Sequence, residues 1–151
     1  MDAISDISRT RAGQTLGRSI LVVDDNELLR DVISAVLARE GCRVTPCPDG
    51  MSAVVRANED VFDTILIDYS MPGLNGATAT EMLRERHLQV NIIGMSMDDR
   101  NKEFLAAGAD AFLAKPFALD DMLSLLKITR SPAQDRESGK ISTALTDPLC
   151  R

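Results

Sequence analysis

The chain has 151 residues, which is enough for one domain with a hydrophobic core but not comfortably for two. Hydrophobic residues make up 44% and charged residues 26%, the composition of a soluble globular protein, and no apolar run approaches the roughly 20 residues of a membrane span. The net charge of −6 argues against direct nucleic-acid binding, and three cysteines with one histidine argue against a disulfide framework or a zinc site.

The two ends of the sequence differ from the middle. Residues 1–18 and 131–151 are polar and lack hydrophobic periodicity, so we expect mobile tails on either side of one domain at 19–130. The N-terminal stretch has no apolar signal-peptide core, which favours a cytoplasmic location and no membrane insertion.

Short apolar runs alternate with helical patterns between the tails. In chain order we expect a strand at Ile20–Val23, a helix through Leu29–Leu37 ending near Gly41, an edge strand at Arg43–Pro46, a short helix from Asp49 through Val55, a strand at Thr64–Asp68, a weaker helix at Thr78–Arg86, a strand at Asn91–Ser96, a short helix at Lys102–Ala107, a strand at Ala111–Lys115, and a last helix that uses Leu119, Met122, Leu123 and Leu126. Uniformly apolar strands that alternate with helices predict an α/β fold with a parallel sheet covered on both faces. Right-handed crossovers make this a doubly wound sandwich.

Polar side chains gather where these strands end. Asp24 and Asp25 follow the first strand, Asp68 ends the third, Ser96 ends the fourth and Lys115 ends the fifth. Ligand sites of such sheets lie at the carboxyl ends of the strands. Clustered carboxylates repel one another, and Mg²⁺ resolves that conflict because it prefers carboxylate, carbonyl and water oxygens. A magnesium ion beside an ammonium and a hydroxyl can hold a phosphoryl group, and Asp68 is placed to attack phosphorus.

Four motifs in this order resemble the receiver domain of bacterial two-component response regulators. They are ILVVDDN, DYSMPGLNG, IIGMS and GADAFLAKPF, and the resemblance extends over about residues 19–130. The family fold it implies is a CheY-like (flavodoxin-like) three-layer sandwich with a five-stranded parallel sheet of order 2-1-3-4-5. The function it implies is that of a single-domain, phosphorylation-dependent response regulator.

The resemblance also implies roles for individual residues. Asp68 would accept a phosphoryl group from a histidine kinase or a phosphotransfer protein. Mg²⁺ would be held by Asp25, Asp68, the backbone carbonyl of Ser70 and waters, with Asp24 acting mostly through water. Lys115 would bind a phosphoryl oxygen, and the Lys115-Pro116 bond is expected to be cis. Two further residues would form the switch: Ser96, which donates to the phosphoryl group, and Phe112, which swings inward as Ser96 moves.

Signalling in the family runs through protein contacts on the fourth helix, fifth strand and fifth helix, to a downstream target that the sequence does not name. If the last helix turns Leu119, Met122 and Leu126 to the sheet, Leu125 and Ile128 point outward, either as part of a wide buried stripe or as a homodimer or partner surface. Met97, where the family usually has Ala or Gly, is expected to shield the phosphoryl pocket. Beyond phosphorylation from donors and slow loss of its own phosphoryl group, we expect no enzymatic activity.

Three alternatives stay open. A haloacid-dehalogenase-like phosphatase also uses an aspartate nucleophile at a strand end, but it needs an acid two residues later, where this chain has Ser70. A flavodoxin-like cofactor carrier would need a hydroxyl- and glycine-rich phosphate loop in place of DDNELL. The chain could also be a receiver excised from a hybrid kinase or from a larger regulator.

Overall fold

The computed structural model describes residues 18–87 and 89–128. Its strands are β1 (Ser19–Val23), β2 (Arg43–Cys47), β3 (Thr64–Asp68), β4 (Asn91–Ser96) and β5 (Ala111–Ala114). Its helices are α2 (Glu27–Arg39), α3 (Gly50–Glu59), α4 (Gly76–Arg86), α5 (Asn101–Ala107) and α6 (Leu119–Ile128). No helix in this part of the chain combines the length and the apolar character that crossing a membrane requires.

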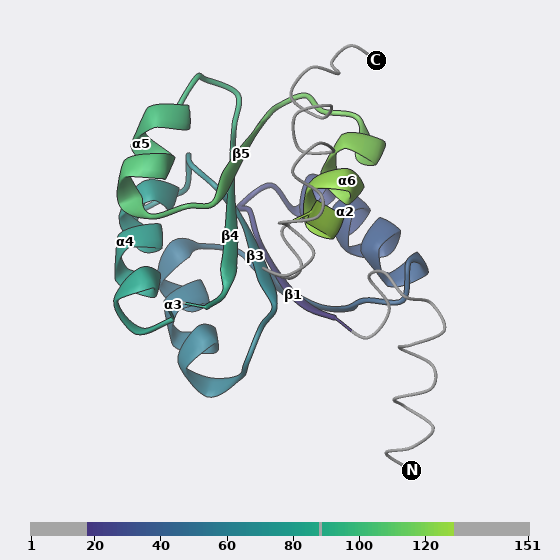
Figure 1. Cartoon of the computed structure of the whole chain (residues 1–151), viewed down its shortest axis with the longest axis horizontal. Coiled ribbons are helices and arrows are strands. Elements are labelled where there is room, and N and C mark those ends of the chain that lie inside the picture. The colour runs from purple at the N-terminus through teal and green to yellow at the C-terminus, as the bar shows by residue number, and fades with distance from the viewer. Residues whose placement is uncertain (1–17, 88, 129–151) are drawn as a thin grey trace.

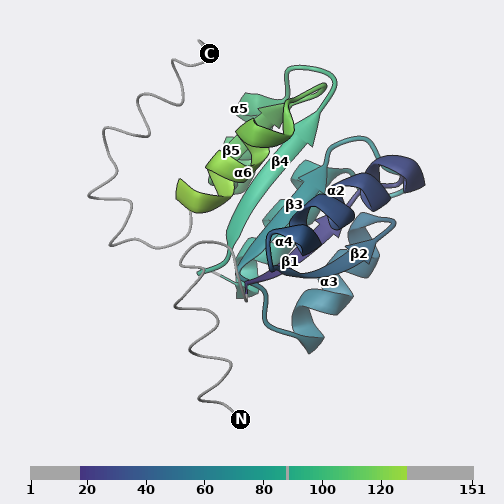
Figure 2. The ribbon, with the colours of Figure 1, turned by 90° about the vertical axis from the view of Figure 1, so that its right-hand side faces the viewer.

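The strands form one parallel sheet in the order β2-β1-β3-β4-β5. Helices α3, α4 and α5 cover one face, and α2 and α6 cover the other (Figures 1 and 2). Successive side chains of a strand point to opposite faces, so Leu21 and Val23 join the core under α3–α5 while Ile20 and Val22 join the core under α2 and α6. The three-layer sandwich expected from the sequence is confirmed.

Three helices begin at the same kind of cap. The side chains of Asn26, Asp49 and Asn75 each accept a hydrogen bond from the backbone N–H three residues later, at the start of α2, α3 and α4. Because Asn75 is the cap, α4 begins at Gly76, two residues before the start expected from its hydrophobic pattern.

The folded unit begins one residue earlier than expected. Arg18, assigned to the N-terminal tail in the sequence analysis, is only 7% exposed. Its guanidinium donates two hydrogen bonds of 3.1 and 3.0 Å to the carbonyl of Leu126 in α6. Residues 1–17 and 129–151 lie outside the described residues, so the two tails remain predictions.

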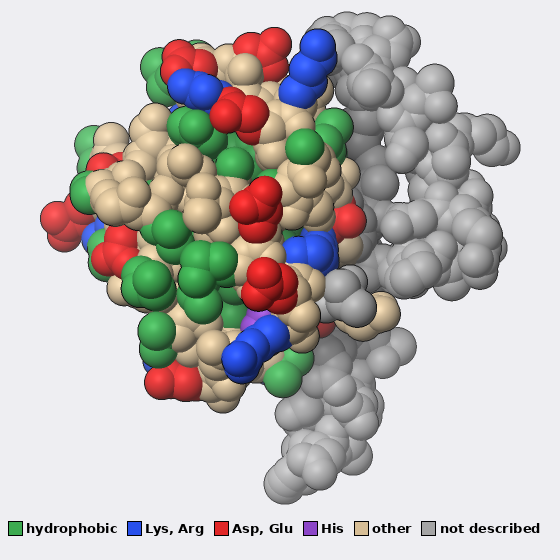
Figure 3. Space-filling model, turned by 90° about the vertical axis from the view of Figure 1, so that its left-hand side faces the viewer, with side chains coloured by type: hydrophobic (Ala, Val, Ile, Leu, Met, Phe, Trp, Pro, Cys, Tyr) green, Lys and Arg blue, Asp and Glu red, His purple; other side chains and the backbone are tan. Residues whose placement is uncertain are grey.

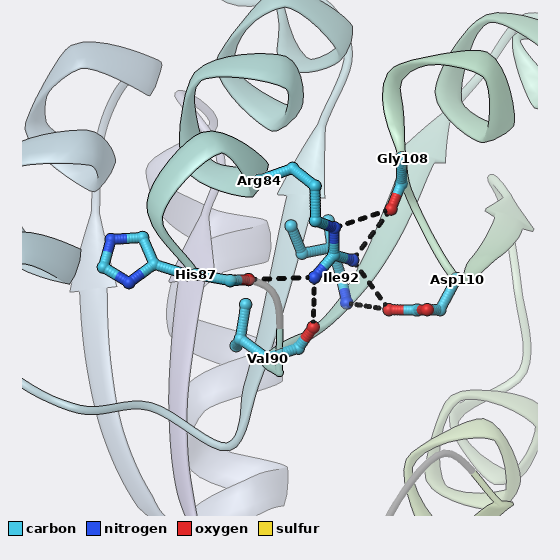
Figure 4. A network of polar contacts seen from close by, with 6 residues as sticks. All are labelled: Arg84, His87, Val90, Ile92, Gly108 and Asp110. Atoms are coloured by element: carbon cyan, nitrogen blue, oxygen red, sulfur yellow. Dashed lines mark hydrogen bonds and ion pairs between the residues drawn. The ribbon is translucent and has the colours of Figure 1, made fainter.

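Arg84 clamps the amino-terminal edge of the sheet, opposite the strand ends that carry the acidic residues (Figure 4). Its guanidinium donates to the carbonyls of Gly108 (3.0 and 2.8 Å), His87 (3.0 Å) and Val90 (2.7 Å). It also pairs at 2.9 Å with Asp110, whose carboxylate accepts the backbone N–H of Ile92 at 2.9 Å. One side chain thereby joins α4 to the segments that lead into β4 and β5.

We expect Arg84→Met to lower the free energy of unfolding by about 2–3 kcal/mol, because it removes the donor of several carbonyls and the ionic partner of Asp110. Urea unfolding of the variant, with the exposed Arg86→Met as a matched control on the same helix, measures this loss. Equal stability of the two variants would show that the clamp contributes nothing to the fold.

Candidate functional site

The ends of β1 and β3 bring three carboxylates together. Asp24, Asp25 and Asp68 each offer a carboxylate oxygen, and these oxygens all lie within 4.8 Å of one another. Asp24 is fully buried, Asp68 is 5% exposed and Asp25 is exposed. Two of the three negative charges are therefore held away from water, and the third stands at the mouth of the site.

Lys115 is the cation that faces this cluster. Its Nζ lies 2.8 Å from Oδ2 of Asp24 and 2.8 Å from Oδ1 of Asp68. The Lys115 N–H donates to the carbonyl of Ser96 at 2.8 Å, which holds the backbone of Lys115 against the end of β4. The Lys115-Pro116 bond is cis, as the resemblance implies. One ammonium facing three carboxylates leaves the cluster with a net negative charge.

The environment shifts the pKa values of both partners upward. For Asp68 the main cause is burial, and the charges of Asp24 and Asp25 raise its pKa further, which together outweigh the hydrogen bond from Lys115. Burial on its own would lower the pKa of Lys115, but its hydrogen bonds to Asp24 and Asp68 prevail and the pKa rises. Lys115 is therefore charged at neutral pH, and the ionised form of Asp68 is costly.

A small hard cation fits this donor set. Mg²⁺ takes one or two carboxylates and keeps waters, and its charge would offset the excess of the cluster. Asp25 is open to solvent, as a ligand that admits a hydrated ion must be. Ser70, two residues after Asp68, lies in the exposed loop between β3 and α4, and its carbonyl as a ligand stays a prediction.

Ser96 and Phe112, the two expected switch residues, occupy neighbouring strands. Ser96 is 2% exposed, and its Oγ accepts the backbone N–H of Asp98 at 3.0 Å. The ring of Phe112 is half-buried and lies 6.0 Å from that of Phe104. Their movements on phosphorylation stay predictions.

The structure bears on two further side chains named in the sequence analysis. Met97 is 73% exposed, so the structure does not show it shielding the pocket. Leu125 is half-buried and packs against the core that contains Met122 and Leu126, which favours the wide buried stripe of the two alternatives left open for this helix. The side chain of Ile128 lies outside the described residues.

The sequence analysis missed two residues that support the site. Arg30 donates to the backbone carbonyl of Asp24 at 2.7 Å from α2, and its place one turn into the helix after the acidic pair was the available signal. Tyr69, directly after Asp68, packs edge-on against Phe104 with the ring centroids 6.0 Å apart. No periodic pattern marks that aromatic pair.

Charged side chains on one face of the sandwich are mixed in sign. On the face formed by α3, α4 and α5, acidic and basic side chains are scattered among hydrophobic ones, without a continuous basic patch (Figure 3). The single histidine, His87, lies near the amino-terminal edge, where its Nε2 is 3.2 Å from Oδ1 of Asn58.

Comparison with known proteins gives a consistent set of similarities. A family model described as the response regulator receiver domain matches residues 20–127. The chain is 35% identical over 113 residues to the transcription factor SKN7 of Saccharomyces cerevisiae, covering 73% of this chain and 18% of that protein. It is similar in structure to the receiver domain of the Francisella response regulator 1452 (TM-score 0.71, 29% identity, 76% of this chain and 97% of the other). It is also similar to a Pseudomonas aeruginosa sensor histidine kinase receiver domain with a magnesium ion coordinated in the active-site cleft (TM-score 0.67, 36% identity, 73% of this chain and 94% of the other). The chain spans less than half the length of the first three curated relatives it matches.

Asp68→Asn is expected to stabilise the protein at neutral pH when divalent cations are chelated. A carboxyl whose pKa is raised by folding destabilises the folded state once it ionises, and this cost disappears as the pH falls below the unfolded value of 3.8. The variant should therefore melt on the order of 5 °C higher at pH 7, and the difference should shrink in acid.

Thermal unfolding across this pH range checks the expectation, with Asp31→Asn, an exposed position on α2, as the matched loss of charge. A lower melting temperature for Asp68→Asn at pH 7 would show that the ion pair with Lys115 outweighs burial and repulsion.

Proposed function

The chain belongs to the receiver domain family of response regulators, and from this premise we propose that it is a phosphorylation-dependent switch with Asp68 as the phosphoacceptor. A histidine kinase or a phosphotransfer protein supplies the phosphoryl group. One observation carries the proposal: three carboxylates within 4.8 Å of one another, two of them bridged by the Nζ of Lys115.

In the proposed transfer, an oxygen of Asp68 attacks phosphorus. The new P–O bond forms as the P–N bond to the donor histidine breaks, and the released imidazole takes up a proton. Bound Mg²⁺ would neutralise negative charge on the transferred group. The ammonium of Lys115 keeps its contact with Asp24 and exchanges its contact with Asp68 for one with a phosphoryl oxygen. Because Lys115 already lies beside Asp68, this exchange needs only a small movement.

The hydroxyl of Ser96 can donate a hydrogen bond to the transferred phosphoryl group. Its Oγ accepts the N–H of Asp98, which leaves the hydroxyl proton free to donate to a phosphoryl oxygen. Movement of Ser96 toward that oxygen draws Phe112 inward, and the face of α5, β5 and α6 then presents a different surface to a downstream protein. A partner on this face, a homodimer included, and a cytoplasmic location are parts of the proposal.

A phosphatase is the weaker assignment. The residue two after Asp68 is Ser70, which has no carboxyl group to protonate a leaving alcohol. Because the chain spans only part of its relatives, the switch can equally serve within a hybrid kinase or a larger regulator.

We expect Mg²⁺-dependent phosphorylation of the protein by acetyl phosphate, and none in Asp68→Asn. A phosphate-affinity gel resolves the two forms, and peptide mass spectrometry after borohydride reduction locates the modified residue. Asp31→Asn should be phosphorylated like the wild type, and an aryl phosphate ester should not be turned over. Equal phosphorylation of Asp68→Asn would contradict the assignment of the nucleophile, and multiple turnover of the ester would favour the phosphatase.

A further inference from the structure

Arg100 and Tyr69 meet across the gap between two loops that border the acidic site. Tyr69 follows Asp68 at the end of β3, and Arg100 ends the loop 97–100 that follows Ser96 at the end of β4. The guanidinium carbon of Arg100 lies 4.2 Å from the centroid of the Tyr69 ring, within the range of a cation–π contact. The contact thus joins the loop that follows Asp68 to the loop that follows Ser96.

Further bonds hold each side of this contact. Arg100 pairs with Glu103 at 2.7 Å and with Asp98 at 3.6 Å, and the hydroxyl of Tyr69 lies 3.4 Å from Oε2 of Glu103. Beneath the ring, Phe104 packs edge-on at 6.0 Å. Tyr69 is therefore fixed from below and from the side, and Arg100 closes over it.

Phe104 can support Tyr69 because β4 carries a glycine. A Cβ atom at Gly94 would overlap the Phe104 ring, so only glycine lets this ring lie against the strand. Phe104 also contacts Phe112, with the ring centroids 6.0 Å apart. A single row of aromatic rings thereby connects the neighbour of Asp68 to the expected switch residue.

The position of Ser96 depends on the same loop. Its Oγ accepts the N–H of Asp98, and Asp98 is paired with Arg100. A displacement of Ser96 toward Asp68 therefore carries the loop along and disturbs the stack on Tyr69. Among the described residues, no acceptor lies at Nε of Arg100 although that atom is buried, so the stacked arrangement leaves a donor unsatisfied.

We propose that Arg100 is a positioning residue, which, stacked on Tyr69, braces loop 97–100 and Ser96 in the phosphoryl-free arrangement. This inference rests on the proposed function. The stack of Arg100 on Tyr69 is the brace, and it must break before Ser96 can move toward a phosphoryl group. A ligand that binds the protein with the stack broken therefore binds more tightly when the stack is removed by mutation. Loss of Arg100 therefore makes the switch easier to turn on.

Simple electrostatics predicts the opposite change in the affinity for a phosphoryl mimic. Arg100→Gln removes a positive charge near an anion site, which by itself weakens binding of an anionic phosphoryl mimic. The brace instead predicts binding of beryllofluoride, in the presence of Mg²⁺, about threefold tighter than in the wild type, the factor that a cation–π contact at an exposed site supplies. The direction of the change separates the two explanations.

The experiment measures beryllofluoride affinity by ¹⁹F NMR in the wild type and five variants. Arg100→Gln and Tyr69→Leu should each tighten binding, and the double variant should not exceed the larger single effect, because both changes remove one contact. Arg100→Lys, which keeps the charge over the ring, should return toward the wild type. Arg56→Gln removes a cation that pairs with Glu59 and Asp60 at the end of α3, and it should leave the affinity unchanged. Weaker or unchanged binding in Arg100→Gln, or additive effects in the double variant, would overturn the proposal.

A second measurement does not need the phosphoryl mimic. Urea unfolding of the same variants, without Mg²⁺, should show a non-additive loss of stability for Arg100→Gln and Tyr69→Leu. If the unfolding data show this coupling and the wild type nevertheless binds no beryllofluoride, the contact between Arg100 and Tyr69 exists, but both the positioning role and the proposed function fail. If it binds beryllofluoride and Arg100→Gln binds equally well, only the positioning role fails.

Discussion

Three carboxylates at one edge of the sheet repel one another, and the other charged contacts of the site follow from that repulsion. Parallel strands place Asp24, Asp25 and Asp68 together, and burial of two of them removes the water that would otherwise screen their charges. Lys115 offsets part of this repulsion with its positive charge. It follows β5, which is separated from β3 and Asp68 by β4. The remaining negative charge is the reason we propose that the site binds a divalent cation and, through it, an anionic group.

The two edges of the sheet are held together by different means. At the amino-terminal edge, the guanidinium of Arg84 donates to backbone carbonyls and pairs with Asp110. At the carboxyl edge, the pair of Lys115 with Asp68 and the stack of Arg100 on Tyr69 contact the loops that border the acidic residues. Backbone carbonyls therefore dominate the contacts at one edge of the sheet, and charged side chains dominate those at the other.

The fold could be predicted closely because its strands are uniformly apolar. Thr64–Asp68 and Asn91–Ser96 have the bounds that their sequence pattern indicates, and the strand-end rule places the acidic residues without any structure. Helix starts depend on a single cap, so α4, capped by Asn75, begins at Gly76, two residues before the start expected from its hydrophobic pattern. Long side chains were beyond prediction: the contacts of Arg84 and Arg100 join positions that no periodicity connects. The direction of a side chain next to a core stripe, as at Leu125, depends on a small rotation of its helix.

A Mg²⁺ titration of the metal-free protein tests whether the three carboxylates form a magnesium site. Tyr69 is the single tyrosine of a chain without tryptophan, and it directly follows Asp68 in the sequence, so its fluorescence emission reports on the site. Asp25 is exposed, and its replacement by Asn should leave the fold intact. We expect a saturable change in Tyr69 emission with one ion bound, with much weaker binding in Asp25→Asn and unchanged binding in Arg56→Gln. No saturable change in the wild type, or equal affinity in Asp25→Asn, would rule out a magnesium site at these carboxylates.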